Sequence, residues 1–175
     1  MRNVLLLTMS MAMALAASGC GDDSDTGSGT PAGSCFDYDA FNAGSPAVTF
    51  RADVLPLFQR SCSTSATSCH GSEAGTSDRQ YLGPQLGTMA TEEQIAKIMA
   101  QNVGVPSKKE PGLSRVAKGD PANSFLMHKM DEPLCEDLTC AADKSCGSAM
   151  PLGQTLEQGD RDVVRRWIAQ GAQNN

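Results

Sequence analysis

The side chains best suited to chemistry lie between Cys62 and Gly71. Cys62 and Cys69 are separated by six residues, and His70 and Gly71 directly follow Cys69. A thiol can form a thioether, ligate a metal or pair as a disulfide, and imidazole is a common metal ligand. The residues alone leave two interpretations open. One is a covalently attached cofactor whose metal is bound by His70, and the other is a Cys62–Cys69 disulfide beside a surface histidine.

The Cys69-His70 pair resembles the haem-attachment motif of c-type cytochromes. In that family two cysteines hold the porphyrin through thioether bonds, and the adjacent histidine ligates the iron. The resemblance implies one covalent haem c, with Cys62 and Cys69 as its thioether residues and His70 as the proximal iron ligand. The family has two residues between the cysteines where this chain has six. A longer loop can still bring Cys62 to the second vinyl group.

Later segments resemble the same family in the expected order. Residues 149–153 (Ala-Met-Pro-Leu-Gly) resemble the loop that returns a sulfur ligand, which implies Met150 as the distal iron ligand. Residues 116–126 and 164–172 are similar to segments of small bacterial cytochrome c domains, the second to their C-terminal helix. The resemblance covers about residues 48–173.

In an exported protein, seven cysteines imply disulfides, covalent cofactor attachment or both. With Cys20, Cys62 and Cys69 assigned elsewhere, four disulfide candidates remain, and they allow three pairings. A bridge within residues 131–147 would pin the loop that carries Met150, and another would tie the start of the fold to it. Zinc is the competing interpretation, but the spacing of Cys135, Cys140 and Cys146 does not match common patterns of zinc ligands. The four candidates are Cys35, Cys135, Cys140 and Cys146.

The N-terminus predicts export and lipid anchoring. Residues 1–19 form a signal peptide, because Arg2 precedes an apolar stretch that is shorter than the roughly 20 residues a membrane span requires. Cys20 follows small residues and resembles the lipid-accepting cysteine of bacterial lipoproteins; the alternative is an ordinary secretory signal. Residues 20–34 form a flexible linker rich in Gly, Ser and Asp, and residues 35–175 form the folded domain.

Apolar residues at helical spacing predict a mainly α fold, a small cytochrome c-like domain of about four short helices with long disulfide-stapled loops. Short helices bury little surface, so disulfides or a cofactor must hold the loops. Trp167 and Ile168 are expected in the core, whereas Arg165 and Arg166 are expected on a solvated helix face, with haem propionates as the alternative. The expected helix signals are N-caps at Asp53 and Asp120, capping boxes at Thr91–Gln94 and Thr155–Gln158, and a stop at Gly171.

A net charge of −6 argues against nucleic acid as a partner, because phosphate binding needs a basic face. We therefore expect an extracytoplasmic electron carrier that is anchored to a bacterial membrane and has redox proteins as partners. It would not be an enzyme. One alternative is a haem-free, disulfide-stapled lipoprotein that acts as a binding or structural module. Another is a haem peroxidase with His128 as distal base, and His128 is also the rival to Met150 as iron ligand.

Overall fold

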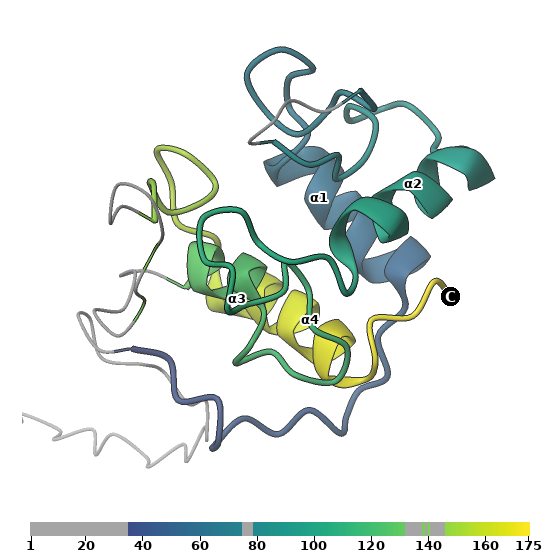
Figure 1. Ribbon diagram of the computed structural model, residues 1–175. Coiled ribbons are helices and arrows are strands. Elements are labelled where there is room, and N and C mark those ends of the chain that lie inside the picture. The colour runs from purple at the N-terminus through teal and green to yellow at the C-terminus, as the bar shows by residue number, and fades with distance from the viewer. Residues whose placement is uncertain (1–34, 75–78, 132–137, 139, 141–145) are drawn as a thin grey trace, which may run out of the picture.

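The computed structural model describes residues 35–74, 79–131, 138, 140 and 146–175 (Figure 1). The expected signal peptide, the lipidated linker and Cys135 lie outside these residues. The described residues form four α-helices and one π-helical turn, with isolated bridges and no strand. The mainly α class is therefore confirmed. None of the helices in this part of the chain has the length and apolar character needed to span a membrane.

The first helix begins earlier than the sequence predicts. A π-helical turn, η1 (Phe50–Val54), runs directly into α1 (Leu55–Ser61). The N-cap is Thr49, whose hydroxyl accepts a hydrogen bond from the Ala52 N–H, so the prediction of Asp53 as N-cap is wrong. Asp53 lies one turn into the helix, and its carboxylate accepts from the Thr49 N–H at 2.7 Å. This reciprocal pair satisfies two donors at the helix start.

The second helix, α2 (Glu92–Asn102), has the predicted capping box. The Thr91 hydroxyl accepts from the Gln94 N–H, and the Gln94 side chain accepts from the Thr91 N–H. Ile95 and Ile98 form the buried face, as their spacing predicts. The capping box therefore fixes where this helix starts, and the apolar pair fixes which face it buries.

Two other predicted helix starts are wrong. Helix α3 (Phe125–Met130) begins after Ser124 rather than Asp120, because residues 120–124 form a turn in which the Asp120 carboxylate accepts from the Asn123 N–H. Helix α4 (Gln158–Ala169) has Glu157 rather than Thr155 as its N-cap. The chain is still extended at Glu157, where ψ is 146°.

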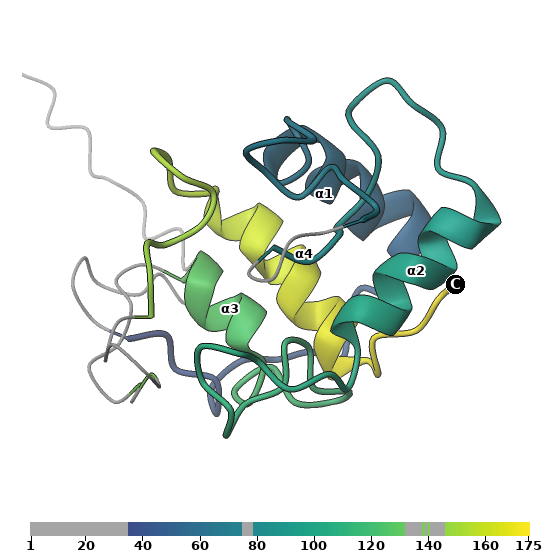
Figure 2. The ribbon, with the colours of Figure 1, turned by 45° about the horizontal axis from the view of Figure 1, so that its top comes forward.

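Helix α4 lies at the centre of the fold, next to α3 and below α1 (Figures 1 and 2). Trp167 packs against Phe50 with ring centroids 5.3 Å apart, so α4 and η1 share one core. Trp167 and Ile168 are buried, which confirms the expectation for both. The helix stops at Gln170, and Gly171 has a φ of 104° that favours glycine.

Arg165 is fully buried, so the expectation of a solvated helix face is wrong for this residue. Its guanidinium pairs with Asp131, which directly follows α3, and with Asp162. It also stacks on Phe36, 3.4 Å from the ring centroid. Asp131 further accepts a hydrogen bond from the Tyr38 hydroxyl at 2.9 Å. This ion cluster ties the N-terminal segment of the domain to α3 and α4.

Candidate cofactor site

A cavity of about 400 Å³ is lined by all four residues that the sequence assigns to the haem. Cys62, Cys69, His70 and Met150 reach it from two segments that are eighty residues apart in the sequence. Its volume falls in the range of small-molecule sites, roughly 300–1,000 Å³. His128 does not line this cavity. Its Nε2 lies 2.6 Å from the Ala122 carbonyl oxygen.

The six-residue spacer folds back on itself and closes the distance between the two ends of the motif. The His70 N–H donates to the Cys62 carbonyl at 3.0 Å, and the Gly71 N–H donates to the Ser65 carbonyl at 3.2 Å. A Cβ on Gly71 would lie 3.0 Å from the Ser65 carbonyl oxygen and 3.1 Å from that of Ser63. Glycine is therefore favoured at this position, because any larger residue would push on these two carbonyls.

Neither Cys62 nor Cys69 is in a disulfide. Cys62 is buried, and its burial, followed by the nearby Cys69, raises the pKa of its thiol to about 12. Cys69 is partly exposed, and the Thr64 hydroxyl, 3.3 Å from its sulfur, is the main cause that lowers the pKa of Cys69. Both thiols therefore line one cavity, and their pKa values are shifted in opposite directions. The Cys62–Cys69 disulfide that the sequence left open is not formed in this structure.

His70 is held so that one ring nitrogen faces a carbonyl. Its Nδ1 lies 2.8 Å from the Gln80 carbonyl oxygen, which can only accept, so Nδ1 carries the proton and Nε2 keeps its lone pair. The Leu82 N–H donates to the His70 carbonyl and fixes the backbone from the same segment. Burial is the main cause that lowers the pKa of His70, which favours the neutral ring. A neutral imidazole with Nδ1–H bonded to a carbonyl is the form that ligates metals through Nε2.

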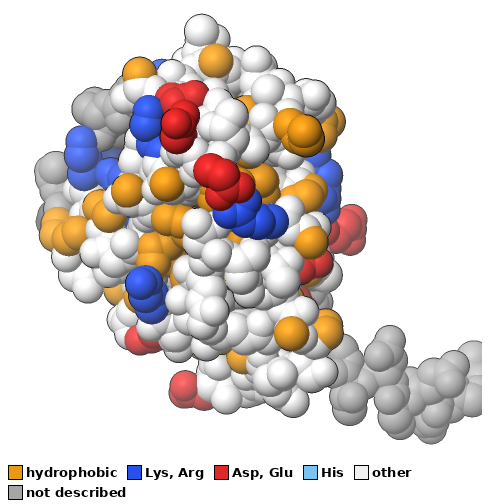
Figure 3. All heavy atoms as spheres, turned by 90° about the vertical axis from the view of Figure 1, so that its right-hand side faces the viewer, with side chains coloured by type: hydrophobic (Ala, Val, Ile, Leu, Met, Phe, Trp, Pro, Cys, Tyr) orange, Lys and Arg blue, Asp and Glu red, His pale blue; other side chains and the backbone are white. Residues whose placement is uncertain are grey.

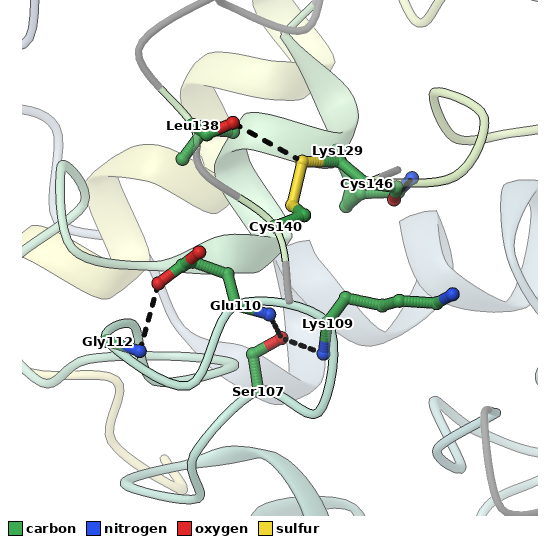
Figure 4. Close-up of a disulfide and its surroundings, with 8 residues drawn as sticks. All are labelled: Ser107, Lys109, Glu110, Gly112, Lys129, Leu138, Cys140 and Cys146. Atoms are coloured by element: carbon green, nitrogen blue, oxygen red, sulfur yellow. Dashed lines mark hydrogen bonds between the residues drawn. A yellow bond between two sulfur atoms is a disulfide. The ribbon is translucent and has the colours of Figure 1, made fainter. Parts of the chain in front are cut away.

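The loop that carries Met150 is fixed to α3 at both of its ends. The Met150 N–H donates to the Lys129 carbonyl at 2.6 Å, and Lys129 Nζ donates to the Cys146 carbonyl at 2.7 Å. Cys146 in turn forms a disulfide with Cys140, with Cα atoms 5.2 Å apart. Figure 4 shows this disulfide with Lys129 and with Lys109 of the neighbouring loop. A bridge in this insert was expected from the sequence, and Cys35 is also disulfide-bonded.

Two further features of the cavity were not anticipated from the sequence. Met130 of α3 lines it and is 1% exposed, although its helical spacing indicated only a core residue. The lining also contains five basic residues and, within the described parts of the chain, no aspartate or glutamate. They come from three separate segments, so no spacing in the sequence groups them. The five are Arg79, Lys108, Lys109, Arg115 and Lys129.

Arg165 and Arg166, for which haem propionates were the alternative partners, do not line the cavity. No family model, curated protein or solved structure matches the chain. The described residues also contain no group of three or more His, Cys, Asp or Glu side chains that could hold a metal ion. The function must therefore be inferred from the cavity itself.

The residues of the cavity fit a haem group. Two unbonded thiols and an imidazole with an available Nε2 are present, and a thioether comes from a second segment. Apolar side chains such as Leu82, Phe125 and Leu126 also line the cavity. Imidazole and thioether are both ligands that iron accepts in haem proteins. The combination of a soft donor set, an apolar lining and basic side chains suits a planar, apolar cofactor with acidic groups.

Proposed function

We propose that this protein is a membrane-anchored extracytoplasmic electron-transfer protein that holds one covalent haem c. The observation that carries the proposal is that Cys62, Cys69, His70 and Met150 line a single cavity. The thiols are unbonded, and the His70 Nε2 is available as a ligand. A structural protein has no evident need for this set of donors around a cavity.

Each cysteine would hold the cofactor by one thioether. The S–H of Cys62 would add across one vinyl group and the S–H of Cys69 across the other, so two C–S bonds form and no group leaves. The closed spacer loop supports this role, because the His70 N–H bond to the Cys62 carbonyl keeps the two ends of the motif together. Cys69, with its lowered pKa, would be the more reactive of the two thiols.

His70 and Met150 would be the two side chains that ligate the haem iron. The Gln80 carbonyl orients the His70 ring, and the Lys129 carbonyl holds the Met150 backbone. When bound, the haem supplies reversible one-electron exchange, and a thioether ligand favours the ferrous state relative to a second histidine. Because two side chains of the protein would ligate the iron, this set of donors supports electron transfer rather than catalysis at an open iron.

The location follows from the N-terminal sequence. Lipidated Cys20 and the linker 20–34 would attach the domain to a bacterial membrane, where it faces the periplasm or the cell exterior. One lipidated cysteine and a flexible linker would leave the domain able to reach redox protein partners. The net charge of −6 supports protein partners rather than nucleic acid.

The proposal is tested by exporting the full chain in a bacterium with cytochrome c maturation machinery and recording its reduced absorption spectrum. We expect sharp c-type bands in the wild type, and loss of those bands in His70→Ala. His128→Ala is the matched control and keeps them, because His128 does not line the cavity. A colourless wild type, in cells that mature a control cytochrome, would reject the proposal in favour of a haem-free disulfide-stapled lipoprotein.

A further inference from the structure

Helix α3 lies between the cavity and an aromatic segment at the start of the domain. The four residues of α3 that line the cavity are Phe125, Leu126, Lys129 and Met130. The His128 ring does not line it and packs instead against the Tyr38 ring, with centroids 5.5 Å apart. Tyr38 belongs to residues 36–41, which lie beside α3 and α4 (Figures 1 and 2). We call residues 36–41 the aromatic strap.

The strap holds the C-terminal end of α3 through Asp131, the residue that closes this helix. The Asp131 N–H donates to the Met127 carbonyl at 2.8 Å, so its backbone is part of the last turn. Its carboxylate accepts a hydrogen bond from the Tyr38 hydroxyl at 2.9 Å and forms an ion pair with Arg165 of α4. Phe36 of the strap covers the Arg165 guanidinium, which lies 3.4 Å from the ring centroid. These contacts join three segments at one end of α3.

The contact between the strap and α3 is buried, unlike the ion pairs at the surface. Arg165 is 0% exposed and Asp131 is 5% exposed. Burial, followed by the charge of Asp131, raises the pKa of Tyr38, so its hydroxyl keeps the proton that it donates. On the face in Figure 3, basic and acidic side chains lie close together at the surface, where solvent and salt weaken their attraction. Breaking the buried contact would leave a charge without its partner, so it holds one geometry.

Helix α3 carries this constraint to the candidate ligand Met150. The helix has six residues, which is less than two turns, and a helix this short depends on tertiary contacts for its position. Lys129 stands two positions before Asp131, and its carbonyl accepts the Met150 N–H at 2.6 Å. Any displacement of this end of α3 therefore moves the hydrogen bond that holds the Met150 backbone.

We infer that Tyr38 and Asp131 are positioning residues for Met150. Neither lines the cavity, and both act through α3 by fixing the Lys129 carbonyl to which the Met150 N–H is bonded. The inference rests on the proposed function where it treats Met150 as an iron ligand. The aromatic strap thus sets how firmly the Met150 side of the cavity is held, independently of the segment that contains the Cys62–His70 motif.

The test measures amide hydrogen exchange of the full chain, exported in a strain that lacks cytochrome c maturation machinery. Two backbone amides report on the two segments that bring the candidate ligands to the cavity. One is that of Met150, and the other is that of His70, which donates to the Cys62 carbonyl at 3.0 Å. Mass spectrometry with fragmentation to single residues gives both exchange rates, which reflect how often each hydrogen bond opens. Neither rate requires haem.

Tyr38→Phe removes the hydroxyl that donates to Asp131 and keeps the ring. We expect it to raise the exchange rate of the Met150 amide about tenfold, the size of one hydrogen bond to a charged group, and to leave that of His70 within about twofold. Thr91→Ala is the matched control, because it removes a single hydroxyl bond at the start of α2 and lowers the stability of the fold without altering the strap. It should leave the ratio of the two rates unchanged.

The haem-loaded protein gives a second readout. Cyanide binds the ferric iron only after Met150 has left it, so the rate of cyanide binding measures how firmly that side chain is held. We expect Tyr38→Phe to accelerate cyanide binding about tenfold and Thr91→Ala to leave it unchanged.

A wild-type Met150 amide that exchanges as fast as that of an unfolded chain would overturn the inference. So would an equal rise of the Met150 rate in Tyr38→Phe and Thr91→Ala, because both would then act through global stability, or an unchanged cyanide rate in Tyr38→Phe. Failure of the proposed function gives a different result. A chain that never acquires haem, but whose Met150 amide responds to Tyr38→Phe and not to Thr91→Ala, keeps the coupling between strap and loop and loses the electron-transfer role.

Discussion

The backbone N–H of His70 donates to the carbonyl of Cys62 across a distance of 3.0 Å. These two residues are eight positions apart in the chain, yet the hydrogen bond makes them neighbours. The spacer between them is closed by a second backbone bond, from Gly71 to Ser65. A motif with an unusually long spacer can thus present its first cysteine and its histidine to the same cavity. The distance between Cys62 and His70 in space is set by this closed loop rather than by the number of residues between them.

Substitution of Gly71 tests whether the closed loop matters. In Gly71→Ala the new Cβ would press on the Ser63 and Ser65 carbonyls, so we expect the loop to open at a cost of about 1–3 kcal/mol. The yield of covalent haem per polypeptide should fall with it. Gly159→Ala is the control, because a Cβ there meets no atom within 4 Å. A Gly71→Ala protein with wild-type stability and haem yield would contradict this role of the loop.

The two thiols should differ in reactivity when no haem is present. The pKa of Cys62 is raised to about 12 by burial, whereas the pKa of Cys69 is lowered, chiefly by the Thr64 hydroxyl. Because the thiolate is the nucleophile, Cys69 should be alkylated first at pH 8, and Cys62 only as pH rises toward its own pKa. Peptide mapping after timed iodoacetamide treatment measures both rates.

Thr64→Val should slow the alkylation of Cys69 and leave Cys62 unaffected. In denaturant the two rates should become equal, since burial and the Thr64 contact are both lost. Faster modification of Cys62 in the folded protein would show that the two environments have been assigned the wrong way round.

Met150 and Met130 both line the cavity, and they form a natural matched pair. If Met150 is the distal ligand, Met150→Ala should remove the red charge-transfer band of the oxidised protein and lower its reduction potential. Met130→Ala should keep that band and instead lose about 2–4 kcal/mol of stability, because it leaves a void at a buried site. If Met130→Ala removes the band and Met150→Ala does not, the ligand has been assigned to the wrong methionine.

The buried ion cluster should be sensitive to loss of one charge. Asp131→Asn leaves the fully buried Arg165 with Asp162 as its remaining charged partner, so we expect a loss of about 3 kcal/mol in denaturant unfolding. Glu92→Gln removes the same charge from the exposed pair with Arg51 and should leave the unfolding midpoint almost unchanged. Equal effects of the two substitutions would mean that Arg165 finds another anion.

The helices were largely predictable from the sequence, and their starts were only partly so. The Thr91–Gln94 box marks α2 because both reciprocal bonds form, and the apolar spacing around Trp167 identifies α4. Asp120 was misleading, since an aspartate before a helix can equally well cap a turn, and here it accepts from Asn123. The structure is needed to decide between these two uses of the same side chain.

The candidate site residues were chosen from a resemblance, and four of them line one cavity, whereas the environment around them could not be predicted. The pair Cys69-His70 is visible in any scan of the sequence, but the folding of its spacer depends on turn contacts with no sequence signature. The burial of Arg165 depends on Asp131, 34 residues away, and on Phe36. The five basic residues that line the cavity come from separate segments, and their spacing in the sequence shows no common period. Long-range pairing of this kind cannot be read from local pattern.

The most direct test of the central claim is the intact mass of the exported full chain under denaturing conditions, after expression with cytochrome c maturation machinery. The account predicts a mass gain of one haem that survives denaturation, retained in part by Cys62→Ala and by Cys69→Ala and abolished when both are replaced. A polypeptide mass with no haem, from cells that correctly mature a control cytochrome, would contradict it.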